Sequence, residues 1–178
     1  MSWMSKLKFY NSRQKNMSLP DVMNYIVKYI ENDPQNVFHF AVTTDSQVIG
    51  RKTVYVIAIH VHKKGKGSWA CMCKIILNRK ILNLRKKIWR EMFYTRSLSN
   101  FFDNAITTKI YEILLPHVDK GADFYPEAHV DIGKKGDTKQ FIKEMSKYFS
   151  GTGVKPLIKP EAWAIKLADK HSKTLKIG

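Results

Sequence analysis

Two aspartates lie at positions in the sequence that could support metal-dependent hydrolysis. Asp45 follows a β-rich apolar run in TTDSQ (43–47), and Asp131 follows another in HVDIG (129–133). We expect both where strands end, at the junction at which open α/β sheets bind ligands. Two neighbouring carboxylates repel each other unless a cation lies between them, so the pair predicts a divalent metal site. Taken singly, each aspartate is also a common turn former.

Two further acids lie on segments with helical periodicity. Glu91 comes three residues after Ile88 and seven before Leu98, within an apolar stripe. A carboxylate on such a stripe needs a partner, and a metal ion at the end of the sheet would be one. Alternatively, Glu91 turns outward to pair with a neighbouring basic side chain. Asp169 lies on the last helical segment, with His171 near enough to assist or replace it.

The elements that must position these acids follow from hydrophobic periodicity and from helix-capping and turn signals. In chain order they are helix 18–32, strands 37–43, 53–62 and 69–77, helix 81–115, strand 127–132, helix 138–149, strand 154–159 and helix 161–172. The stretch 97–100 (SLSN) predicts a bend or break in the long helix, because serine and asparagine compete for backbone hydrogen bonds.

The order of these elements predicts an α/β fold. An antiparallel three-strand meander followed by strand–helix–strand units gives one mixed sheet with helices packed on its faces. The strand before Asp131 is expected to run parallel to the strand before Asp45, on the edge opposite the hairpin. We expect a basic N-terminal segment over 1–17 and a single domain over 18–178, a size at which a chain can bury a substantial core.

The predicted hairpin carries two histidines and two cysteines. His60 and His62 lie on one strand, Cys71 and Cys73 on the next, and zinc is conceivable for such a set. In the register we expect, His60 faces Cys71 but the other two residues do not meet, which favours buried cysteines and packed histidines. The cysteines are too close in sequence for a good disulfide, so we expect a reducing, cytoplasmic location.

Charge is the most unusual property of the composition. The 178 residues include 31 Lys and Arg but 15 Asp and Glu, a formal net charge of +16. No apolar run approaches the ~18–20 residues of a membrane span, so we expect no membrane partner. The excess favours a polyanionic partner, namely RNA or DNA. The basic residues that we expect to contact phosphates are Lys63, Lys64, Lys66, Arg85, Lys86, Arg90, Lys134 and Lys135.

Five short motifs resemble one known family. They are KFYN (8–11), TDSQ (44–47), HVDIG (129–133), KP (159–160) and ADKHSK (168–173). In this order they are similar to the YkuK family of predicted RNase H-like nucleases. The resemblance implies the ribonuclease H-like fold, a five-stranded mixed sheet flanked by helices. It also implies phosphodiester hydrolysis with two divalent metals, held here by Asp45, Glu91, Asp131 and Asp169.

The leading hypothesis is therefore a nuclease that uses Mg²⁺ or Mn²⁺, the ions that carboxylate oxygens suit. Two such ions clamp an in-line displacement at the phosphorus. One alternative is a non-catalytic nucleic-acid-binding module that retains the fold. Another is a structure-specific, junction-resolving endonuclease, which would need two sites in a dimer.

Overall fold

The computed structural model describes residues 3–173 and has one mixed sheet at its centre. The strand order is β3-β2-β1-β4-β5, with antiparallel pairing along β3-β2-β1 and parallel pairing along β1-β4-β5. The strands are β1 (Val37–Ile49), β2 (Lys52–Lys63), β3 (Gly67–Leu77), β4 (Asp123–Gly133) and β5 (Lys155–Lys159). The predicted meander, the two parallel strands and the α/β class are confirmed.

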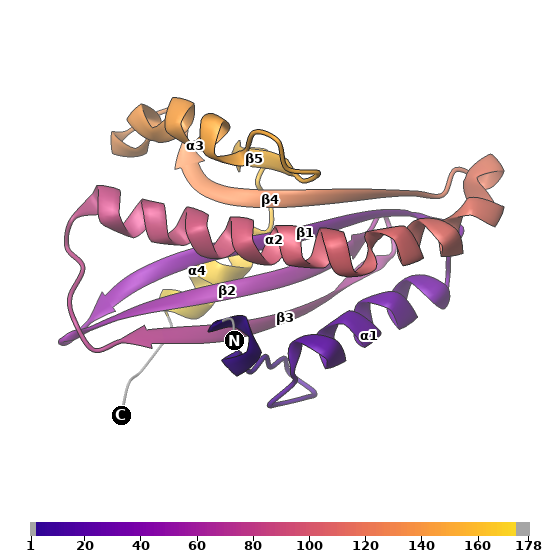
Figure 1. Cartoon of the computed structure of the whole chain (residues 1–178), viewed down its shortest axis with the longest axis horizontal. Coiled ribbons are helices and arrows are strands. Elements are labelled where there is room, and N and C mark those ends of the chain that lie inside the picture. The colour runs from indigo at the N-terminus through magenta and orange to yellow at the C-terminus, as the bar shows by residue number, and fades with distance from the viewer. Residues whose placement is uncertain (1–2, 174–178) are drawn as a thin grey trace.

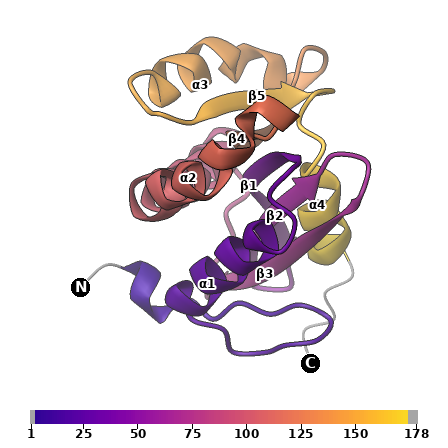
Figure 2. The same cartoon turned by 90° about the vertical axis from the view of Figure 1, so that its right-hand side faces the viewer.

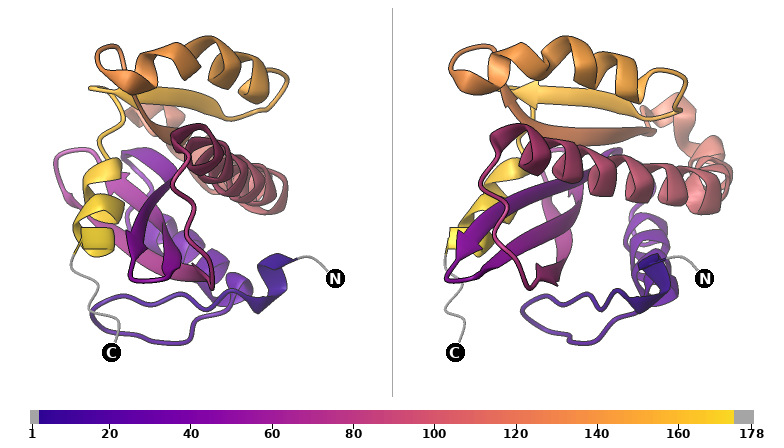
Figure 3. Two further views of the ribbon diagram at one scale, coloured as in Figure 1. Left: turned by 90° about the vertical axis from the view of Figure 1, so that its left-hand side faces the viewer. Right: turned by 60° about the vertical axis from the view of Figure 1, so that its left-hand side comes forward.

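Helices cover both faces of the sheet (Figures 1 and 2). The α-helices are α1 (Leu19–Glu31), α2 (Leu84–Leu114), α3 (Ile142–Phe149) and α4 (Ile165–Lys173). Short 3-10 helices span Trp3–Lys6, Leu115–Lys120 and Asp137–Phe141. In both views α1 and α2 lie on one face and α4 on the other, and Figure 3 shows α3 beside β4 and β5. Among the described residues, no helix combines the length and hydrophobicity of a membrane span.

Alternation along β1 separates an apolar face from a polar one. Phe38 and Phe40 point to the main core under α1 and α2, where Phe40 packs 5.4 Å from Phe102 between ring centroids. His39 and Asp45 point to the opposite face, where α4 contacts Asp45 through Ser172. Asp45 therefore lies on the side of β1 opposite the main core.

Two predicted interruptions are wrong. β1 does not end before Asp45 but continues to Ile49, because each of its residues from Phe38 onward has an antiparallel partner on β2. The long helix is unbroken across 97–100, because Leu98 and Ser99 are buried against the sheet and this packing overrides local preference. The last helix begins at Ile165 rather than near 161, and the predicted helix 138–149 starts as a 3-10 turn.

The hairpin register differs by one residue from the expected one. His60 pairs with Ala70, and Cys71 pairs with Ile59, because the tip closes with Lys63 opposite Gly67. A shift of one residue moves side chains to the other face. The cysteines therefore lie in the core under α1 and α2, while His60 and His62 lie on the α4 face, which excludes the zinc set.

The described part of the N-terminal segment packs onto the domain. Phe9 is fully buried, and Tyr10 exchanges two backbone hydrogen bonds of 2.8 Å with Met72 of β3. The boundary between 17 and 18 stays a prediction, and residues 1–2 and 174–178 lie outside the described residues.

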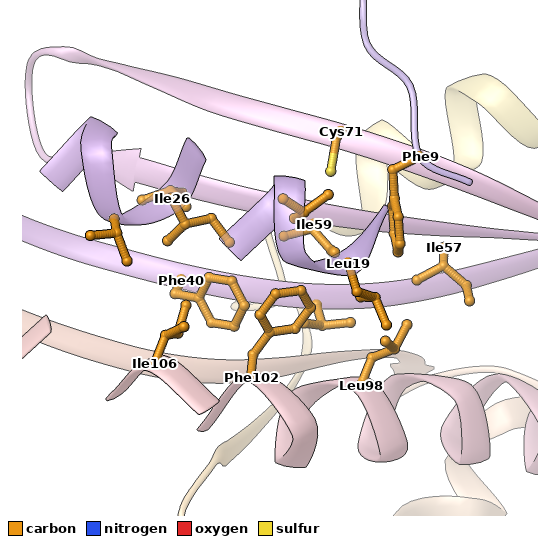
Figure 4. Packing of buried hydrophobic residues seen from close by; sticks show 14 of the residues in the cluster. Phe9, Leu19, Ile26, Phe40, Ile57, Ile59, Cys71, Leu98, Phe102 and Ile106 are labelled. Carbon is orange, nitrogen blue, oxygen red and sulfur yellow. The ribbon is translucent and has the colours of Figure 1, made fainter. Parts of the chain in front are cut away.

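The main core should respond strongly to loss of one aromatic ring (Figure 4). Phe102 is fully buried between α2 and the sheet, so Phe102→Ala should lower the free energy of unfolding by about 3–5 kcal/mol. Leu82→Ala is the control, since Leu82 is 76% exposed and should change it by less than about 0.5 kcal/mol. Equal denaturant midpoints for the two variants would contradict this account of the core.

Candidate metal centre

The candidate site forms where two parallel strands part. β1 and β4 pair from Val37 opposite Asp123 to Thr43 opposite His129, and there the pairing stops. Asp45 follows Thr43 by two residues and Asp131 follows His129 by two residues. Because side chains alternate along a strand, each aspartate lies on the same face of its strand as the residue two positions before it. Beyond this point lies a cavity of about 360 Å³. Its lining residues are Asp45, Ser46, Leu84, Lys87, Ile88, Glu91, Asp131, Gly133, Lys135, Thr138 and Lys159.

Glu91 enters this cavity from α2 and is 8% exposed, as the helical phase predicts. The Ser46 hydroxyl donates to its Oε1 at 2.5 Å. Burial raises the pKa of Glu91 to about 8; the Ser46 bond and Lys87 oppose the shift, and the charges of Asp45 and Asp131 add to it. A metal-free site therefore holds Glu91 mainly protonated at neutral pH.

Asp45 is half-buried at the centre of the acidic group. The Ser172 hydroxyl of α4 donates to its Oδ2. Burial raises the pKa of Asp45; the Ser172 bond opposes this, and the charges of Asp131 and Asp169 raise it further. Asp45 thus interacts electrostatically with each of the other three acids.

The remaining two acids each contact an ammonium group. Lys159 Nζ lies 2.5 Å from Asp131 Oδ1, and Lys173 Nζ donates to Asp169 Oδ2 at 2.8 Å. Asp169 is 39% exposed and lies outside the cavity lining. His171 is also outside that lining, and the pKa of its imidazole is lowered by burial and by Lys170 and Lys74.

The donor set fits a hard divalent cation in its chemistry. Asp45, Glu91 and Asp131 supply carboxylate oxygens to one cavity, and two of them have pKa values raised by burial and mutual repulsion that a cation would relieve. In the described part of the chain, however, no three His, Cys, Asp or Glu side chains are close enough to hold one ion. A metal bound here would have to displace Lys159 from Asp131. The role of the four acids as ligands stays a prediction.

The predicted phosphate-contacting residues are divided among several places. Lys63 and Lys66 approach Asp33 at 3.1 and 3.4 Å, at the hairpin tip. Lys63 pairs with Phe38, seven residues before Asp45, so the tip lies about 23 Å from Asp45 at ~3.3 Å per residue. This tip, which includes Lys64, therefore lies away from the acids, and its contact with phosphates stays a prediction.

The other basic residues lie closer to the acids. Arg85, Lys86 and Arg90 line a hollow of about 740 Å³ on α2, the helix that carries Glu91. Arg85 also pairs with Glu144 at 2.9 Å, and Lys134 with Glu161 at 3.3 Å. Lys135 lines the acidic cavity itself.

Sequence reasoning missed the four side chains that pair with the acids: Ser46, Lys159, Ser172 and Lys173. All four fall within the motifs 44–47, 159–160 and 168–173 that carry the family resemblance. Those motifs could have identified them as site residues, although not their particular partners.

The fold and the acidic cavity define an α/β protein with carboxylates gathered where two parallel strands diverge. The Ribonuclease H-like family model matches residues 21–173. The chain is 35% identical to the uncharacterized protein YkuK of Bacillus subtilis (strain 168) over 166 residues, which cover 93% of this chain and 96% of that protein. Among solved structures, none matches significantly. The chain belongs to the ribonuclease H-like family, and the resemblance to YkuK is confirmed.

The raised pKa of Glu91 predicts how stability depends on pH. A carboxyl whose pKa rises from 4.5 to about 8 on folding stabilises the protein below pH 4.5, and this contribution is lost as the pH rises through 8. In EDTA, Glu91→Gln should flatten the fall in free energy of unfolding between pH 5 and 9. Glu112→Gln, at an exposed position of the same helix, should keep the wild-type slope. Identical slopes for all three proteins would contradict the raised pKa of Glu91 in the folded protein.

Proposed function

We propose that this protein is a metal-dependent nuclease that hydrolyses phosphodiester bonds of RNA or DNA. The observation that carries the proposal is the cavity that Asp45, Glu91 and Asp131 share where β1 and β4 part, in a chain of the ribonuclease H-like family. Asp45, Glu91, Asp131 and Asp169 are the proposed ligands of Mg²⁺ or Mn²⁺. Such ions, when bound, activate water and neutralise charge on the phosphoryl group.

The other residues of the cavity contribute positive charge. Lys87 and Lys135 line it beside the acids and are the groups proposed to receive the phosphates that flank the cleaved bond. Lys159 pairs with Asp131, and with Asp131 on a metal it would be free to contact the phosphate. Net charge +16 supports a nucleic-acid partner, since Lys and Arg supply the phosphate contacts of such proteins.

A non-catalytic nucleic-acid-binding module is the second candidate function. The observation in its favour is that all four acids have a partner within the protein: Ser46, Ser172, Lys159 and Lys173. A junction-resolving endonuclease would share the nuclease chemistry and differ in its substrate. Cleavage of single-stranded, duplex, hybrid and four-way-junction substrates with either metal distinguishes these possibilities.

Asp45→Asn is the central test of the nuclease. The substitution keeps the shape of the side chain but removes the charge that a metal needs, so metal-dependent cleavage should fall to background in a folded protein. In the wild type, a metal at 100 times its Kd should stabilise the native state by about 2.7 kcal/mol, a rise in Tm of roughly 5–10 °C. The variant should show a smaller rise.

Asp119→Asn is the matched control, because Asp119 is exposed in the 3-10 helix after α2. It should cleave and respond to metal like the wild type. Wild-type cleavage by Asp45→Asn, or no effect of Mg²⁺ and Mn²⁺ on the wild-type Tm, would replace the nuclease with the binding module.

Binding to nucleic acid should depend steeply on salt, because phosphate contacts release counterions. In the Asp45→Asn background, replacing Lys134 and Lys135 with alanine should reduce the slope of log K against log [salt] by about 1.4 on single strands, at ~0.7 per phosphate. The pair Lys109 and Lys120, both exposed near the far end of α2, is the charge-matched control and should leave the slope unchanged. Equal slopes for both double variants would remove the loop after Asp131 from the interface.

A further inference from the structure

Another hollow, separate from the acidic cavity and from the hollow beside α2, lies on the α4 face of the sheet. It measures about 440 Å³ and is lined by His39, His62, Lys64 and Trp163. His39 of β1 and His62 of β2 are direct cross-strand partners, and Trp163 comes just before α4. None of these residues lines the acidic cavity. We call this the Trp163 hollow.

A buried hydrogen-bond network holds one wall of this hollow. Glu127 of β4 is 6% exposed, and its two oxygens lie 2.9 Å from His39 Nδ1 and 2.8 Å from His129 Nε2. The backbone N–H of Ala164 donates to His129 Nδ1 at 3.1 Å. His129 therefore carries its proton on Nε2 and donates it to Glu127.

This network determines which polar atom His39 offers to a ligand. Burial raises the pKa of Glu127, but the hydrogen bonds from His129 and His39 outweigh it, and the pKa lies below its ordinary value. Glu127 is thus a carboxylate that accepts from both imidazoles. Since Nδ1 of His39 is used in this way, Nε2 is its remaining polar atom on the wall of the hollow.

The aromatic wall is equally well held. The Trp163 ring lies 4.7 Å from His60 and 4.9 Å from His129 in edge-to-face contacts, and 5.6 Å from His62. Because the residue also precedes Ala164, the network places its backbone as well. A positioned indole beside an exposed ammonium is a combination that suits a base and its phosphate.

Other ligands fit these observations less well. A purely apolar molecule would make no polar contact with Lys64 or with the imidazoles of His39 and His62. A metal ion would need more ligands than two histidines, and the described residues include no group of three that could hold one. A nucleotide uses the indole, the ammonium and the imidazoles together.

We propose that the Trp163 hollow binds one nucleotide of a single-stranded segment, with its base against Trp163 and its phosphate on Lys64 and His62. The proposal rests on the proposed function and specifies its substrate. His39 and Asp45 lie on the same face of β1, six residues apart, which is about 20 Å at ~3.3 Å per residue. At ~3.4 Å per stacked nucleotide, about six nucleotides join the two sites. The preferred substrate therefore carries a single-stranded extension of at least about that length.

Binding of two DNA duplexes tests this in the Asp45→Asn variant, which prevents cleavage. One duplex has blunt ends and the other carries a twelve-nucleotide single-stranded tail. The protein should bind the tailed duplex more tightly than the blunt one. Lys64→Ala and Trp163→Leu should each lower the affinity for the tailed duplex about tenfold. Neither variant should change the affinity for the blunt duplex by a comparable factor.

Lys66→Ala is the charge-matched comparison, because Lys66 is exposed on the same hairpin tip but lies near Asp33 and outside the hollow. It should weaken binding to both duplexes by the same small factor.

Two results would show that the hollow is not a nucleotide site: Lys64→Ala behaves like Lys66→Ala, or the Asp45→Asn protein with Lys64 and Trp163 intact binds both duplexes equally. Either result would leave the proposed nuclease unaffected. If neither duplex binds at all, the proposed function and this proposal both fail. Lys64 is exposed, so its variant keeps the test valid should Trp163→Leu not fold.

Discussion

The end of pairing between β1 and β4 is the constraint on which the acidic site depends. As long as two parallel strands share hydrogen bonds, their backbones stay about 4.8 Å apart and leave no room for a ligand. After Thr43 and His129 the bonds stop, while β1 remains attached to β2 as far as Ile49. The strands therefore separate at the position where each presents an aspartate. A cavity between Asp45 and Asp131 follows from this geometry.

The concentration of like charge in that cavity requires compensation. Burial and repulsion disfavour ionised carboxyls, which is the reason that the pKa values of Asp45 and Glu91 are raised. The protein offsets this with two serine hydroxyls on these same acids and with ammonium groups on Asp131 and Asp169. Each acid thus has a partner within the protein, and the acidic group favours positive charge, whether from lysine or from a divalent ion.

Helix α4 connects the acidic site with the rest of the polar face. At its N-terminal side, the Ala164 N–H binds His129, which Glu127 holds in turn; near its C-terminal end, Ser172 binds Asp45. The same helix is thus attached through polar contacts at both ends, and these contacts also place Trp163. The opposite face packs against α1 and α2 through the main apolar core, and α2 adds two buried polar contacts with β1, Ser46 to Glu91 and Thr95 to Thr44. The candidate site therefore draws on both sides of the sheet, with Asp45 from the α4 side and Glu91 from the α2 side.

Local patterns in the sequence determined the order of elements, the α/β class, the inward phase of Glu91 and the family, because periodicity and short motifs are properties of neighbouring residues. Tertiary structure decided the rest. β1 passes through Asp45 because β2 pairs with it there, and α2 stays continuous because Leu98 is buried. The hairpin register depended on how the tip closes. Lys159 and Ser172 acquired their roles from carboxylates 28 and 127 positions away in the chain, and such contacts exist only once the strands and α4 are assembled.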